Sequence, residues 1–110
     1  MKNKLIALSK EKGFKSKIIL FDDYKSLIDT KYYLWLCELK MWMITENGLF
    51  CSGNPVTHLQ EFQACIEQDN LLHFVTVYDS LSIDNGVTTY DTLPQALEKA
   101  LFEGLKLTQK

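Results

Sequence analysis

Arginine is absent from this 110-residue sequence, and the net charge is −2. The planar arginine fork is the side chain best suited to binding phosphate groups and guanine bases. An acidic protein also repels a polyanion such as DNA or RNA. The composition therefore argues against nucleic acid as the partner.

Cysteine is scarce and unpaired in the sequence. The three cysteines, Cys37, Cys51 and Cys65, are odd in number and form no Cys-x-x-Cys pair, so a secreted disulfide framework is not expected. Reduced thiols fit a cytoplasmic protein. His58 and His73 are the only histidines, and their gaps to the cysteines are longer than those of zinc half-sites. We therefore predict no metal site and no cofactor.

Motifs that support catalysis are also missing. The five glycines are scattered, and none forms a phosphate-binding loop. No cysteine and histidine stand in a pattern that predicts a nucleophile with its base. Asp79, Asp84 and Asp91 border a loop, where aspartate commonly serves as a turn or cap residue. The sequence therefore predicts no catalytic residue, and we expect a protein that is not an enzyme.

Long hydrophobic runs are absent. No segment approaches the ~20 apolar residues that cross a bilayer. The apolar letters LIAL at 5–8 are too few for a signal peptide, and Lys10 follows them closely. We expect a cytoplasmic protein with no membrane partner.

Lysine is concentrated at the start of the chain. Residues 1–17 contain six of the twelve lysines and only one acidic residue, Glu11. Such a segment is usually a solvated helix face. The alternative is a basic arm that binds an acidic partner or nucleic acid loosely, by charge and therefore with strong salt dependence. The residues of that arm are Lys10, Lys12, Lys15 and Lys17.

The first third of the chain predicts one short helix and one ambiguous segment. Residues 3–12 read as a helix with Asn3 as its N-cap. Gly13 suits the left-handed position that ends a helix, and Phe14 would then fold back on it. Residues 17–21, KIILF, form either a strand or an extended connector.

Three segments in the middle of the chain favour strands. Residues 49–57 contain Gly53 and Pro55, which predict an interrupted strand at a sheet edge. Residues 61–68 alternate between apolar and polar side chains, as a half-buried strand does. Residues 71–78 are apolar on both faces, as a central strand is.

The last helix, residues 92–107, has the clearest signals. Thr92 and Gln95 form a capping box, and Pro94 falls in the first turn, where its missing N–H costs nothing. The small residues Ala96, Ala100 and Gly104 predict close packing against a sheet or helix. The predicted solvated face comprises Glu98, Lys99, Glu103 and Lys106.

These elements predict an α+β fold of order α-(β)-α-β-β-β-α, in which a small antiparallel sheet of two to three strands packs against helices. We expect a single domain, 1–110, with residues 1–22 as a basic helix and extended segment that flanks the core formed by 23–110. The second half has the element order of double-stranded-RNA-binding folds. The start of its last helix, YDTLPQALE, lacks the lysines that grip phosphates in such domains, so the order does not predict their function.

The segment KYYLWLCELKMWMITEN, 31–47, predicts a central helix with Asp29 or Thr30 as its cap and Gly48 as its stop. It has two apolar faces. The first face comprises Tyr32, Trp35, Leu36, Leu39, Trp42 and Met43. The second stripe, roughly opposite, comprises Tyr33, Leu34, Cys37, Met41 and Ile44.

A helix that is apolar nearly all round is buried on both sides. The sheet accounts for one face. The second stripe is covered either by the N-terminal helix together with residues 17–21 or by a partner, which is another protein or a second copy of the chain. Binding along a membrane surface is not expected, because the helix lacks a cationic face. The candidate interaction residues are Tyr33, Cys37, Met41 and Ile44.

Three blocks of the sequence resemble those of a family. LSKEKGF at 8–14, KYYLWLCELKMWM at 31–43 and TYDTLPQALEKALFEGLKL at 89–107 are similar to blocks in small uncharacterised proteins of phages and mobile elements of gut bacteria. Residues 49–88 depart from that family, and Met41 and Met43 replace more polar helix residues. The resemblance implies a phage or prophage accessory protein, and it assigns no functional residue. The second stripe adds the expectation that this protein acts by binding another protein.

Overall fold

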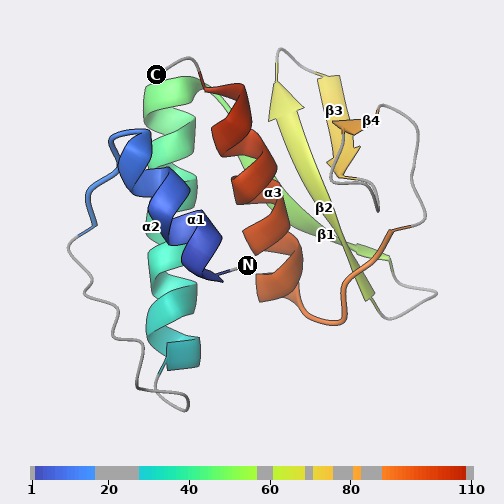
Figure 1. Ribbon diagram of the computed structural model, residues 1–110. Coiled ribbons are helices and arrows are strands. Elements are labelled where there is room, and N and C mark those ends of the chain that lie inside the picture. Colours follow the sequence, from blue (N-terminus) through green and yellow to red (C-terminus); the bar gives the residue numbers. More distant parts are fainter. Residues whose placement is uncertain are drawn as a thin grey trace.

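The computed structural model describes residues 2–16, 28–56, 61–68, 71–75, 81–82 and 88–108. It confirms the α+β class and the predicted order of helices and strands (Figure 1). The elements are α1 (Lys2–Glu11), α2 (Ile28–Asn47), β1 (Phe50–Val56), β2 (Glu61–Gln68), β3 (Leu71–Val75), β4 (Leu81–Ser82) and α3 (Leu93–Leu107). The predictions for residues 17–21 and 76–78 lie outside the described residues.

The four strands form one antiparallel sheet in the order β1-β2-β3-β4. Its fourth strand, which the sequence did not indicate, has only two residues. α3 lies against β1 and β2, α2 packs beside α3 and on β1, and α1 packs on α3 (Figure 1). The helices therefore cover one face of the sheet, and α3 stands at the centre of the molecule.

β1 forms the edge of the sheet, as predicted, but Gly53 and Pro55 do not interrupt it. Phe62 of β2 exchanges backbone hydrogen bonds of 2.9 and 2.7 Å with Tyr90 on the side away from β1. The direction of the backbone N–H and C=O groups alternates along a strand, so those of the next residue, Gln63, are directed toward its partner Asn54 on β1. The backbone groups of Gly53 and Pro55 are then directed away from β2, at the outer edge of the sheet. The missing N–H of proline therefore costs no bond within the sheet.

The close approach of α3 to the sheet depends on two glycines. A Cβ added at Gly104 would lie 2.7 Å from Cys51 Sγ and 3.1 Å from Met43 Cε. One added at Gly53 would lie 2.7 Å from Leu93 Cδ1. All three distances are shorter than the contacts between non-bonded atoms in a packed core. The predicted role of Gly104 in close packing is therefore confirmed.

The start of α3 has the predicted capping box. The backbone N–H of Gln95 donates to Thr92 Oγ1 at 3.3 Å, and the backbone N–H of Thr92 donates to Gln95 Oε1 at 3.2 Å. The predicted polar face is wrong at one residue. Glu103 is buried, and its carboxylate accepts a 2.9 Å ion-pair contact from Lys106. The lysine provides the partner that a buried carboxylate needs.

The end of α1 was also predicted correctly. The N–H of Phe14 donates to the carbonyl of Ser9 at 2.9 Å, the N–H of Gly13 donates to that of Lys10 at 3.1 Å, and Gly13 has φ 99°. This pair of bonds is the Schellman arrangement. The predicted N-cap is wrong, because α1 begins at Lys2 and Asn3 lies inside it.

Candidate interaction surface on helix α2

α2 is longer than the sequence predicts. It begins at Ile28, so the proposed caps Asp29 and Thr30 lie within the helix. It ends where predicted: Gly48 has φ 66°, and its N–H donates to the Ile44 carbonyl at 3.2 Å. A positive φ at this position suits glycine, since other residues pay a steric cost there. The helix therefore presents about five full turns to its surroundings.

The first face of α2 is built into the core. Leu36, Leu39 and Met43 are fully buried, and Trp35 is 4% exposed. These side chains belong to one continuous apolar cluster with residues of α1, α3, β1 and β2. This face therefore supplies the contacts that hold α2 to the rest of the protein.

The N-terminal segment packs on this same first face. The ring of Phe14 lies 5.7 Å from that of Trp35 in an edge-to-face arrangement and 5.5 Å from that of Trp42. The expectation that the N-terminal helix covers the second stripe is thus not met for the described residues of this segment. The two tryptophans lie seven residues, or about two helical turns, apart, and the Phe14 ring contacts both.

Tyr32 fixes α2 against α3 at the border of the first face. Its hydroxyl donates to Glu98 Oε2 at 2.5 Å, and its ring stacks on Trp35 at 5.9 Å. Burial and then the neighbouring carboxylate raise the pKa of Tyr32. The phenol therefore stays protonated and continues to donate across the physiological range.

The second stripe lies on the opposite side of α2 and remains open. Leu34 is 53% exposed and Met41 is 58% exposed, whereas Tyr33, Cys37 and Ile44 are half-buried. Residues three and four apart on a helix lie side by side, so 34, 37, 41 and 44 form one continuous line. Large apolar side chains gathered in this way commonly mark a contact surface. Three of the four predicted interaction residues, Cys37, Met41 and Ile44, therefore lie in this line, and the fourth, Tyr33, lies one turn before Cys37; of the four, Met41 is exposed and the others are half-buried.

A residue that the sequence analysis missed extends this surface. Phe50, at the start of β1, is 43% exposed, and the Lys40 ammonium lies 4.9 Å from the centre of its ring. Lys40 borders the second stripe, so the lysine links the helix face to the phenylalanine of the sheet edge. The only sequence signal was an apolar residue two positions after the helix stop Gly48, which by itself does not distinguish core from surface.

The three cysteines occupy different environments. Cys51 and Cys65 are fully buried, and burial raises the pKa of the first thiol to about 12 and that of the second to about 11. Lys40 offsets part of the effect at Cys51. Cys37 is half-buried within the second stripe. The thiolate is the reactive form, so burial and the raised pKa values both slow reaction at Cys51 and Cys65, and Cys37 is the more accessible thiol.

We expect one fast-reacting thiol in the folded protein. At neutral pH a maleimide should label Cys37 quickly and leave Cys51 and Cys65 unlabelled until the chain unfolds. Peptide mass spectrometry after timed labelling measures this, with a urea-unfolded sample as the reference for three accessible thiols. Equal labelling of all three in the folded state would contradict the burial of the other two.

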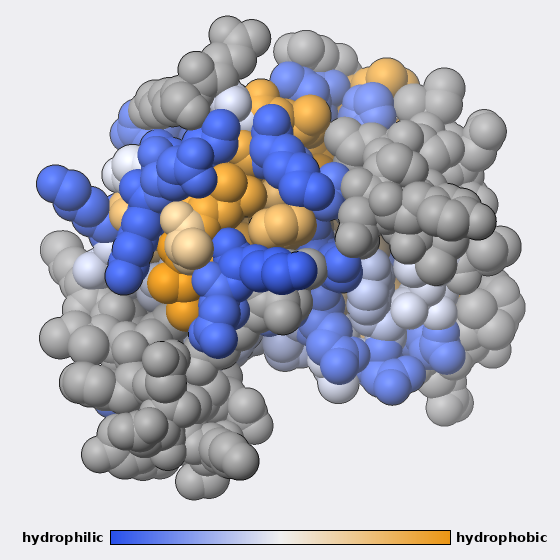
Figure 2. All heavy atoms as spheres, viewed as in Figure 1, coloured by the Kyte–Doolittle hydropathy of each residue, from blue (hydrophilic) through white to orange (hydrophobic). Residues whose placement is uncertain are grey.

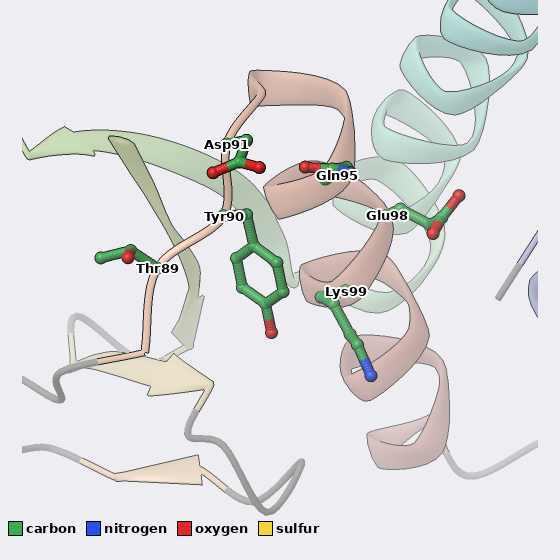
Figure 3. Close-up of a pocket in the computed structure, with 6 residues that line it drawn as sticks. All are labelled: Thr89, Tyr90, Asp91, Gln95, Glu98 and Lys99. Atoms are coloured by element: carbon green, nitrogen blue, oxygen red, sulfur yellow. The ribbon is translucent and has the colours of Figure 1, made fainter. Parts of the chain in front are cut away.

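A surface depression of about 290 Å³ lies between α3 and the segment before it. In Figure 3 the side chains of Tyr90 and Lys99 lie near each other, and that of Glu98 extends away from them. Glu98 accepts the Tyr32 hydrogen bond, and Gln95 takes part in the capping box. These two side chains are thus used by the fold. The depression gathers no nucleophile with a base, and we assign it no role.

The lysine-rich segment is described in part. Lys10 and Lys15 are exposed, while Lys12 Nζ donates to the Thr108 carbonyl at 3.3 Å and so ties α1 to the end of α3. Lys17 lies outside the described residues. Figure 2 shows hydrophilic residues around a hydrophobic area over α1. Of the residues of the basic arm, Lys10 therefore lies in the last turn of α1, and Lys12 forms a hydrogen bond within the fold.

Comparisons with protein-family models, with characterised proteins and with solved structures found no match. Within the described ranges, no helix combines the length and apolar character needed to cross a bilayer. The same residues contain no group of three or more side chains placed to hold a metal ion.

Proposed function

We propose that this protein is a non-enzymatic accessory protein, of the phage or prophage type that its three sequence blocks resemble, and that it acts by binding another protein chain through the second stripe of α2. The observation that carries this proposal is the exposure of Leu34 and Met41 on the side of α2 opposite its buried face. A helix held by one face offers the other without unfolding, so binding needs no rearrangement of the core.

The chemistry of the stripe suits a helical partner. Leucine, methionine and isoleucine side chains in one line form the type of surface on which an amphipathic helix docks. Methionine is flexible and polarizable, so it adapts to an opposing apolar surface. The exposed Phe50 adds an aromatic side chain at the border, and aromatic residues are enriched in interfaces.

Met41→Glu tests the proposal because it places a charge in the middle of the stripe. Met41 is exposed, so the variant should unfold at nearly the same temperature as wild type, as is usual for surface substitutions. It should nevertheless lose binding to the partner protein. The matched control is Leu71→Glu, which charges a 48% exposed leucine on β3. The measurement is affinity capture with immobilised wild type and both variants, quantified by mass spectrometry.

We expect that immobilised wild type and Leu71→Glu capture the same partner, which is another protein or this chain itself. Immobilised Met41→Glu should not capture that partner. If every retained protein binds all three forms equally, the stripe is not the binding surface and the proposal fails.

A further inference from the structure

The N-terminal helix α1 has little internal support. It has ten residues, fewer than the ~12–15 below which an isolated helix is marginal in water. Its first turn carries Lys4 and no acidic residue, although the positive end of the helix dipole favours negative charge there. The residue before the helix is methionine, whose side chain has no oxygen that could cap it. α1 therefore depends on contacts with the rest of the protein.

The contacts that α1 makes are few. Among its described side chains only Leu5 and Ser9 are buried, whereas α3 buries seven. The Ser9 hydroxyl is used within the helix, because it donates to the Ile6 carbonyl at 2.8 Å. The hydrogen bond from Lys12 to the Thr108 carbonyl holds the end of the segment to α3. Leu5 is thus the one fully buried apolar side chain that the described part of α1 contributes.

Phe14 provides a second anchor, and it is tied to the end of α1. Its side chain is 4% exposed, and its ring lies against Trp35 and Trp42, the two tryptophans of the chain. Its backbone N–H donates the Schellman hydrogen bond to the Ser9 carbonyl. If α1 loses its helical form, that bond is lost and no longer positions the ring. The helix and the aromatic contact therefore open together.

The core beneath this segment is continuous without it. α3 lies on β1 and β2, and α2 packs on α3 and β1, so these elements contact one another directly. Figure 1 shows α1 lying over α2 and α3, away from the strands. The fully buried side chains of the remaining core are Leu36, Leu39, Met43, Cys51, Ile66, Leu101 and Leu105, among others. Loss of α1 therefore leaves the contacts between the sheet and its two long helices in place.

From these observations we infer that residues 2–14 form a strap that detaches by local unfolding while α2, α3 and the sheet stay folded. Segments with few buried contacts open at a lower free energy than the core. Opening uncovers Trp35 and Trp42 on the first face of α2, so the protein has a closed form and an open form with a larger exposed aromatic surface. The inference does not depend on the second stripe, which lies on the opposite side of α2.

Hydrogen exchange of the full chain, followed by mass spectrometry over a series of low urea concentrations, tests the strap without any substitution. We expect the amides of residues 6–14 to be protected at least about tenfold less than those in the middle of α3. Their exchange should depend little on urea, because local opening exposes little new surface. Equal protection and equal urea dependence in the two segments would show one cooperative unit and overturn the inference.

Phe14→Ala should hold the strap open, because it removes the ring that anchors it. Residues 6–14 should lose nearly all protection and the tryptophan emission should shift to longer wavelength, while α3 stays protected. The matched control is Phe50→Ala, which removes a 43% exposed ring at the start of β1 and should leave the exchange of residues 6–14 as in wild type. Unfolding of α3 together with the strap in Phe14→Ala would contradict a separable strap, and unchanged tryptophan emission would contradict the uncovering of Trp35 and Trp42.

Discussion

Replacing Trp35 with alanine is expected to lower the free energy of unfolding by about 3–5 kcal/mol, as truncation of a buried aromatic residue usually does. Trp35 is 4% exposed, its ring stacks on Tyr32, and the edge of Phe14 contacts it. The substitution removes both contacts and leaves a cavity between the N-terminal segment and α2. Urea unfolding followed by circular dichroism measures the change as a shift of the midpoint.

The adjacent residue gives a matched control. Leu34→Ala removes an exposed side chain from the opposite side of the same helix, and alanine has the best helix propensity, so we expect a change within about 0.5 kcal/mol. Comparable losses at positions 34 and 35 would mean that both faces of α2 contribute to the core, and the second stripe would not be available to a partner.

Gly104→Val is expected to destabilise the protein by about 3 kcal/mol, at the upper end of the usual cost of overpacking a core. The new Cβ would lie 2.7 Å from Cys51 Sγ and 3.1 Å from Met43 Cε, before the two methyl groups are counted. Valine also loses side-chain freedom in a helix. α3 would have to move away from β1, which loosens the whole helix layer.

Combining Gly104→Ala with Cys51→Ala tests whether contact with the Cys51 sulfur is the reason that position 104 requires glycine. Alanine at 104 gains about 1 kcal/mol of helix propensity over glycine but meets the sulfur atom. Removing the sulfur should relieve that contact, so the double variant should be more stable than the sum of the single changes predicts, by at least about 1 kcal/mol. Additive effects in a double-mutant cycle of urea unfolding would show that close contact with Cys51 is not what requires glycine.

Local signals along the chain predicted α3 almost completely. The capping box, the proline in the first turn and the stripe of small residues all lie within about fifteen residues. Each of these signals depends only on residues that are close in the sequence. Glu103 was the exception. Its spacing placed it on the polar face, but a carboxylate can be buried where a lysine three residues later pairs with it, and the depth of that site depends on distant parts of the chain.

The surroundings of α2 could be predicted only in part. The repeat of apolar residues gave two faces, and the structure buries one of them. Which segment covers which face is a tertiary property, since Phe14 reaches Trp35 and Trp42 across a long stretch of sequence. Phe50 was missed for a related reason: an apolar residue after a helix stop is compatible with either core or surface until the sheet is placed.

The most direct test of an open second stripe compares two methionines of the same helix. Met41 is 58% exposed, and Met43 is fully buried. Under limited peroxide oxidation, mass spectrometry should show Met41 oxidised much faster than Met43, because only Met41 is accessible to the oxidant. Equal rates at the two positions would contradict a helix with one buried and one exposed face, and with it the proposed interaction surface.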